Sequence, residues 1–209
     1  MQDAVQEPLR SWATAEPTRA ATWLAHVGVP WWIAGGWALD LFLDKVGRHH
    51  ADLDIGVFRR DIVDVLAALP EWECFEARGG ALTRLAIGAA PRADVHSLWC
   101  RPAGTAEWVF EIMLDASDGD SWLFRREPLI RRPLSTLTRV GASGIRYLAP
   151  EIQLLYKAKA VRPNDQADFD RVVPRLDEVA GSWLRDSLAK TSPGHAWLTA
   201  LGRFDGRGA

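Results

Sequence analysis

Several features that would narrow the function of a protein are scarce in this chain of 209 residues. It has two cysteines, Cys74 and Cys100, and neither has a neighbour at metal-ligand spacing. This argues against a disulfide framework and favours two small, partly buried apolar side chains. No apolar run is long enough to span a bilayer, and residues 1–10 lack the basic start and apolar core of a secretory signal. We therefore expect a cytoplasmic protein.

An excess of charge of either sign is also missing. The chain has 25 Lys and Arg against 27 Asp and Glu, which gives a net charge of -2. Proteins that bind nucleic acid along its backbone usually carry a clear basic surplus, so a general nucleic-acid partner is not expected. An apolar content of 48% with 25% charged residues is ordinary for a soluble globular protein, and the length suits one domain or one domain with a helical appendage.

What the chain does have is an unusual stretch between residues 31 and 58. The apolar run Trp31–Ala34 predicts a short strand, and it stops at Gly35 and Gly36, which tolerate positive φ and let a ligand approach the backbone closely. Residues 37–43 then predict a short apolar helix. Because backbone N–H groups at the start of a helix face outward along its axis, this turn is a plausible phosphate site.

Two aspartates follow on the next expected strand. Alternation along a strand sends Asp52 and Asp54 to the same face. Two neighbouring carboxylates repel each other unless a cation compensates them, and Mg²⁺ favours one or two carboxylates completed by water and substrate phosphates. The pattern predicts phosphoryl or nucleotidyl transfer.

This stretch resembles the signature of the polymerase-beta-like nucleotidyltransferases, in the branch that modifies lincosamides and the 2″-hydroxyl of aminoglycosides. One departure is Asp44, which stands where members of the branch often have glycine. The resemblance implies Mg²⁺-dependent transfer of a nucleoside monophosphate to a hydroxyl of a small antibiotic-like molecule, with release of pyrophosphate. AMP from ATP is the first candidate for the transferred group. The residues that carry the resemblance are Gly35, Gly36, Trp37, Asp40, Arg48, His50, Asp52 and Asp54.

The resemblance also implies a third carboxylate, for which two candidates remain open. Residues 93–100 and 107–114 predict a hairpin, and each arm offers one inward acid, Asp94 or Glu111. Asp94 with His96 is similar to the Asp-hydrophobic-His run of lincosamide enzymes, whereas Glu111 lies in a strongly apolar strand. We favour Glu111 slightly.

The C-terminal part predicts helices over residues 148–159 and from Asn164 onward. By resemblance, Lys157 contacts the nucleotide phosphates, and Asp168 anchors the two helices or orients that lysine. The predicted catalytic residues are Asp52, Asp54, Glu111 and Asp94; the nucleotide-binding residues are Gly35, Gly36, Trp37, Arg48, His50 and Lys157; and the metal ligands are Asp52, Asp54 and Glu111.

We expect an α/β (α+β) fold with a mixed sheet and flanking helices. Residues 1–147 would form the nucleotidyltransferase domain and residues 148–209 a helical region packed on it. Residues 115–120 are interpreted as a solvated acidic turn. A basic cluster is interpreted as a solvated rim, with a role in holding a triphosphate as the alternative; it comprises Arg125, Arg126, Arg131 and Arg132.

Two other functions are compatible with the sequence. One is a nucleotidyltransferase that modifies a protein or transfer RNA, and the near-neutral charge weakens its RNA version. The other is a non-catalytic nucleotide-binding module. The unpaired acids Asp52 and Asp54 on one strand face argue against it, because a module without catalysis has no physical need for them. Three tryptophans flank the expected site, Trp31, Trp32 and Trp37, and packing is the favoured role for all of them.

Overall fold

The computed structural model describes residues 11–204 of the chain. Residues 1–10, on which the expectation about a secretory signal rests, lie outside this range. Among the helices of residues 11–204, none has the length and apolar character needed to cross a membrane.

The centre of the fold is a mixed sheet, as the sequence predicts. Its strands run in the order β4-β3-β5-β6-β2-β1-β10-β9, and β7 and β8 extend it from the end of β6. The strands are β1 Trp31–Ile33, β2 Asp54–Phe58, β3 Trp72–Arg78, β4 Ala81–Arg84, β5 Ser97–Pro102, β6 Phe110–Asp118, β7 Ser121–Leu123, β8 Arg131–Pro133, β9 Thr138–Val140 and β10 Arg146–Leu148.

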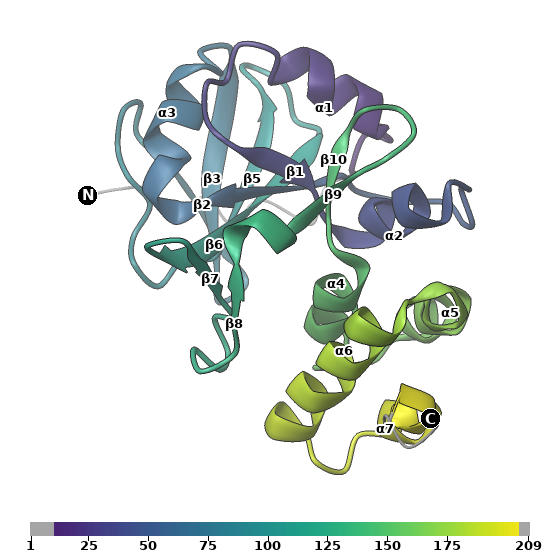
Figure 1. Ribbon diagram of the computed structural model, residues 1–209. Coiled ribbons are helices and arrows are strands. Elements are labelled where there is room, and N and C mark those ends of the chain that lie inside the picture. The colour runs from purple at the N-terminus through teal and green to yellow at the C-terminus, as the bar shows by residue number, and fades with distance from the viewer. Residues whose placement is uncertain (1–10, 205–209) are drawn as a thin grey trace.

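The helices lie around this sheet and below it (Figure 1). In the view of Figure 1, α1 and α3 lie beside the upper strands, whereas α4 to α7 gather below the sheet next to α2. Helix α4 contacts both α2 and α6. The helices are α1 Pro17–Trp23, α2 Gly35–Leu43, α3 Ile62–Ala67, α4 Pro150–Lys157, α5 Pro163–Val172, α6 Glu178–Thr191 and α7 Trp197–Leu201.

Strand order brings the predicted motifs together. Strands β1 and β2 are antiparallel, with Ile33 opposite Ile55, so the turn that ends β1 lies beside the start of β2 at Asp54. Strands β2 and β6 are parallel, and Asp54 is opposite Glu111. Because residues opposite each other in neighbouring strands point to the same face, the two acids share one face of the sheet.

Two predicted elements differ from the structure. The strand expected over residues 93–100 begins only at Ser97, because a turn closed by the Val95 N–H on the Arg92 carbonyl precedes it. The solvated turn expected over residues 115–120 is wrong for Asp115, because β6 continues to Asp118. Asp115 tolerates burial there because its carboxylate accepts hydrogen bonds from Tyr156 and Trp122.

The departure at Asp44 is accommodated by an unusual backbone conformation. Asp44 ends α2 with φ of 50° and ψ of 35°, in the left-handed region. Glycine is the usual residue at such a helix end, but aspartate adopts this conformation more readily than most other residues. The turn that members of the branch often make with glycine is therefore made here by an aspartate.

The tryptophans near the first strand belong to the core. Trp32 is 1% exposed, and its indole Nε1 lies only 1.9 Å from the position that a Cβ atom on Gly56 would take. Trp37 is also buried and packs against the His50 ring with 4.4 Å between ring centroids. Gly56 therefore interrupts a buried strand because the Trp32 ring occupies the space of a side chain.

We expect the Gly56→Ala variant to lower the free energy of unfolding by about 1 to 3 kcal/mol, because the added methyl group must displace the Trp32 indole from a closely packed core. Urea unfolding followed by tryptophan fluorescence measures this. The matched control is Gly28→Ala, where no atom lies within 4 Å of the added Cβ and the change should be small. Equal stability of the two variants would contradict the packing argument.

Candidate active site

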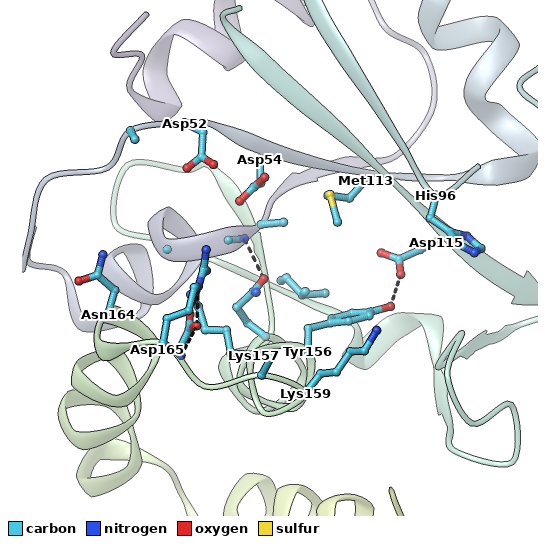
Figure 2. Close-up of a pocket in the computed structure, with 18 of the residues that line it drawn as sticks. Asp52, Asp54, His96, Met113, Asp115, Tyr156, Lys157, Lys159, Asn164 and Asp165 are labelled. Atoms are coloured by element: carbon cyan, nitrogen blue, oxygen red, sulfur yellow. Dashed lines mark hydrogen bonds and ion pairs between the residues drawn. The ribbon is translucent and has the colours of Figure 1, made fainter. Parts of the chain in front are cut away.

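A single cavity collects most of the predicted site residues. Its volume is about 630 Å³, and it lies between the turn after β1, the loop before β2, strand β6 and the helices α4 and α5. Figure 2 shows Asp52 and Asp54 on one side of it and Tyr156, Lys157 and Asp165 on the other. A cavity of this size suits a small organic molecule or a nucleotide.

The glycine turn forms one wall of this cavity. Gly35 has φ of +63°, and a Cβ atom at this position would lie 1.8 Å from Asp54 Oδ2. Its N–H donates a 2.8 Å hydrogen bond to the side-chain oxygen of Gln153 on α4. Only glycine satisfies both the backbone conformation and the close approach of the carboxylate.

Gly36 continues the turn as the second residue of α2. A Cβ atom here would lie 2.3 Å from Arg48 Nη2 and 2.5 Å from His50 Nδ1. The N-cap residue Ala34 makes no side-chain hydrogen bond, and the Gly35 N–H is taken by Gln153, so the N–H groups of Gly36 and Trp37 are the ones in the first turn that a ligand could use. The turn can therefore bind an anion such as a phosphate, as the sequence predicts.

Three acids meet beside this turn. Asp52 precedes β2 and is exposed, Asp54 begins the strand, and Glu111 lies opposite Asp54 on β6. Burial, together with the charges of Glu111 and Asp52, raises the pKa of Asp54 well above its usual range. Burial also raises the pKa of Glu111, although hydrogen bonds to Ser97 and Trp99 oppose this. The three acids are therefore close enough to disfavour one another's ionisation.

The donor chemistry of this site fits magnesium. Within residues 11–204, no set of three His, Cys, Asp or Glu side chains is arranged to hold an ion by itself. Magnesium does not need such a set, because it is commonly bound by one or two carboxylates together with water and substrate phosphates. Asp52 and Asp54 both line the cavity and could supply those carboxylates.

The cations of the site are held by acids from α5. Lys157 Nζ lies 2.7 Å from Asp165 Oδ1 and 3.2 Å from Asp168 Oδ2. Arg48 makes a two-pronged contact with the same Asp168, at 3.2 Å and 3.1 Å. Burial disfavours ionisation of Asp165, but hydrogen bonds from Arg162 and Lys157 outweigh it and lower its pKa. Asp168 thus joins Arg48 to Lys157 and fixes the position of both.

His50 lies behind the cavity and supports it. Its Nε2 is 2.7 Å from Asp40 Oδ2, and Asp40 Oδ1 accepts a second hydrogen bond from Arg171 on α5. Burial disfavours the charge on Asp40, yet the contacts with His50, Gly47 and Arg171 prevail and its pKa is lowered. His50 and Trp37 are absent from the cavity lining, whereas Arg48 is part of it.

The two candidates for the third carboxylate lie in different parts of the structure. Asp94 lies in the loop before β5, is about half exposed and pairs with Arg78 at 2.7 Å. Neither Asp94 nor Glu111 is part of the cavity lining. Glu111 is directly opposite Asp54. The structure therefore brings Glu111, and not Asp94, to the other two acids.

Sequence reasoning missed several residues of the site. Gln153 precedes Tyr156 by three residues and Lys157 by four, so its side chain lies on the same side of α4 as theirs. This spacing was the available signal. Asp115 was not recognised because it begins an acidic stretch, residues 115–120, that was interpreted as a solvated turn. The basic cluster is divided, since Arg125 and Arg126 line the cavity while Arg131 pairs with Asp118 elsewhere.

We expect the Asp54→Asn variant to be more stable than the unchanged protein in the absence of metal at pH 7. In the folded state the Asp54 carboxyl keeps its proton at pH values above the ordinary pKa of 3.8, whereas in the unfolded state it loses the proton near that pH. The folded state then binds more protons, so stability falls as the pH rises through this window. The asparagine should remove this fall and raise the free energy of unfolding at pH 7.

Chemical unfolding in EDTA at several pH values measures this effect. Asp170→Asn, which changes an exposed acid of α5, is the control and should leave the pH dependence unchanged. A destabilised Asp54→Asn variant would show that the carboxylate is compensated within the protein.

Comparisons with known proteins agree with this geometry. The family model described as aminoglycoside-2''-adenylyltransferase matches residues 18–172. No protein of curated function matches the sequence. The lincosamide antibiotic adenylyltransferase LnuA in its lincomycin-bound crystal structure is 16% identical, with 78% of this chain and 98% of that chain covered and a TM-score of 0.54.

Two further solved structures share the fold. ANT(2")-Ia in complex with adenylyl-2"-tobramycin is 13% identical over 84% of this chain and 98% of that chain, with a TM-score of 0.56. An antigenic nucleotidyltransferase-like protein from Paracoccidioides brasiliensis is 18% identical over 92% and 95%, with a TM-score of 0.50. The resemblance seen in the sequence is confirmed, and the chain belongs to the aminoglycoside-2''-adenylyltransferase family of nucleotidyltransferases.

Proposed function

We propose that this enzyme transfers a nucleoside monophosphate to a hydroxyl of a small molecule in a Mg²⁺-dependent reaction that releases pyrophosphate. AMP from ATP is the first candidate for the transferred group. The observation that carries the proposal is the contact between the glycine turn and the acids. Gly35 lies against Asp54, and Glu111 is opposite Asp54 on the next strand. The glycine turn and the acids Asp52 and Asp54 are thereby adjacent in one cavity.

The nucleotide phosphates are assigned to the glycine turn. N–H groups at the start of α2 would donate hydrogen bonds to the phosphate oxygens, with Lys157 and Arg48 as nearby cations. The contacts with Asp165 and Asp168 orient these two side chains before the nucleotide binds. His50 has a supporting role, because it holds the loop that carries Arg48 against Asp40.

Asp52 and Asp54 are the proposed ligands of Mg²⁺, with Glu111 as the third carboxylate. When bound, the ion would neutralise charge on the transferring phosphoryl group and lower the pKa of the attacking hydroxyl. The raised pKa of Glu111 makes its carboxylate a better proton acceptor than an ordinary glutamate. Asp94 keeps a lesser claim, because it pairs with Arg78, whereas Glu111 is directly opposite Asp54.

The reaction is an in-line displacement at the α-phosphorus. The acceptor oxygen forms the new bond to phosphorus, and the bond to the oxygen bridging the α- and β-phosphates breaks. Pyrophosphate leaves with that electron pair, and the hydroxyl proton passes to Glu111. Asp54 and Glu111 are opposite each other in neighbouring strands. An acceptor hydroxyl near both carboxylates would therefore face the α-phosphorus.

The acceptor class is suggested by the comparisons and by the size of the cavity. LnuA is described as lincomycin-bound, and ANT(2")-Ia is bound to an adenylylated tobramycin. Lincosamides and aminoglycosides are therefore the first acceptors to test. A cavity of about 630 Å³ favours a small acceptor over a protein or transfer RNA.

The test is transfer of radiolabel from the α-phosphate of ATP to lincomycin, tobramycin and a mixed cell extract, with Mg²⁺ present. We expect label on a small molecule, and we expect the Asp52→Asn/Asp54→Asn double variant to lose at least about a thousandfold in rate, because it lacks both metal ligands.

Asp61→Asn/Asp64→Asn, which changes two acids outside the cavity, is the matched control and should retain the rate. Label on protein or RNA alone would contradict a small-molecule acceptor. No transfer, together with no Mg²⁺-dependent binding of ATP, would contradict the proposed function altogether.

A further inference from the structure

Helix α4 meets the glycine turn because β1 and β10 are parallel neighbours. Ile33 of β1 is paired with Tyr147 of β10. Strand β1 leads into the turn and α2, and β10 leads into α4, so both helices begin at the same edge of the sheet. Helices α2 and α4 are in contact. A side chain from the start of α4 can therefore reach the glycine turn.

Gln153 is the side chain that reaches it. This residue is the fourth of α4, is 7% exposed and lines the cavity. Its Oε1 accepts a hydrogen bond from the Gly35 N–H at 2.8 Å. Because an N–H group can donate only to the oxygen of an amide, this contact fixes the orientation of the Gln153 side chain. The Nε2 hydrogens are left for another partner.

The Gln153 Nε2 atom is open to the cavity. It makes no hydrogen bond within residues 11–204. In the same range, the side-chain polar atoms that are fully enclosed without a partner are the indole nitrogens of Trp32 and Trp37. Nε2 therefore has accessible surface, and the cavity that this buried side chain lines is where that surface lies. Because buried amides normally pair both of their ends, the open donor indicates a ligand.

This donor lies beside an acid that is expected to bind Mg²⁺. A Cβ atom on Gly35, whose N–H the amide accepts, would lie 1.8 Å from Asp54 Oδ2. In Figure 2, Asp54 lies across the cavity from Tyr156 and Lys157, which follow Gln153 on the same side of α4. An uncharged donor suits this place. A cation would pair with the Asp54 carboxylate, whereas an amide leaves that carboxylate free for a metal ion.

The amide also replaces a donor that the glycine turn has lost. The Gly35 N–H is occupied, so Gly36 and Trp37 supply the N–H groups of the first turn that a ligand could use. Gln153 occupies one N–H with its oxygen and offers its own N–H groups at the other end of the same amide. The glycine turn and α4 together therefore present one set of uncharged donors to the cavity.

We propose that Gln153 binds the nucleotide directly, with Nε2 donating a hydrogen bond to a phosphate oxygen of the triphosphate while Oε1 holds the glycine turn. This inference rests on the proposed function, which assigns the phosphates to that turn. Gln153 is then both a ligand of the substrate and a brace of the backbone that binds it. The two roles can be separated by experiment, because they use different atoms.

Two substitutions separate the donor from the brace. Gln153→Glu keeps an oxygen for the Gly35 N–H but replaces the amide donor by a carboxylate oxygen, which repels phosphate. Gln153→Met has a similar shape and lacks both groups. Calorimetry with α,β-methylene-ATP and Mg²⁺ at pH 8 measures the affinity. We expect each variant to bind the analogue at least about tenfold more weakly, the loss expected for one hydrogen bond to a charged group.

Gln166→Glu is the matched control. Gln166 lies on α5 outside the cavity lining, and its Oε1 likewise accepts an N–H, that of the Trp197 indole at 2.7 Å. This variant should change the affinity by less than about twofold. If Gln153→Glu binds the analogue like the unchanged protein, the proposal is overturned. Weak binding by Gln153→Met alone would then show that Gln153 only braces the turn.

A spectroscopic measurement on the unchanged protein tests the contact itself. The side-chain amide signals of Gln153 and Gln166 are assigned in ¹H–¹⁵N spectra, and α,β-methylene-ATP is added to the protein in Mg²⁺. We expect the Gln153 signals to shift more than those of Gln166. Gln153 signals that move no more than the Gln166 signals would contradict the proposal while the proposed function stands. Absence of Mg²⁺-dependent binding of the analogue would instead refute the proposed function.

Discussion

The close contact between Gly35 and the Asp54 carboxylate is the constraint on which the rest of the site depends. It exists because β1 and β2 are antiparallel, so the turn leaving one strand meets the start of the other. Gln153 fixes the same turn from the opposite side, through the Gly35 N–H. The contact therefore ties the sheet to α4 and sets the distance between the glycine turn and the Asp54 carboxylate.

The division of charge within the cavity follows from this arrangement. Near the glycine turn, Asp168 pairs with both Arg48 and Lys157, and buried pairs of this kind hold side chains in one geometry more than they stabilise the fold. Farther along the cavity, Arg125 lies over the Tyr156 ring and Arg126 donates to the Tyr156 carbonyl oxygen. The cations nearest the glycine turn are therefore the ones that acids of α5 hold in place.

Local spacing was enough to predict the fold class and to name two residues, Gly35 and Asp54, that the structure brings into contact. Gly35 with Asp54 could be found because glycine turns and alternating acids leave a pattern within about 20 residues. The third carboxylate could not be decided, because Asp94 and Glu111 fit a strand pattern equally and only the register of β2 with β6 separates them. Asp115 was missed because its hydrogen-bond partner Tyr156 is 41 residues away in the chain.

The most direct test of a Mg²⁺-dependent nucleotidyl transfer site is a crystal structure with α,β-methylene-ATP and Mn²⁺, which replaces Mg²⁺ at oxygen ligands and scatters anomalously. An anomalous peak bound by the carboxylates of Asp52 and Asp54, with nucleotide phosphates at the N–H groups of the glycine turn, is the expected result. A nucleotide bound elsewhere, or manganese away from both carboxylates, would contradict the account.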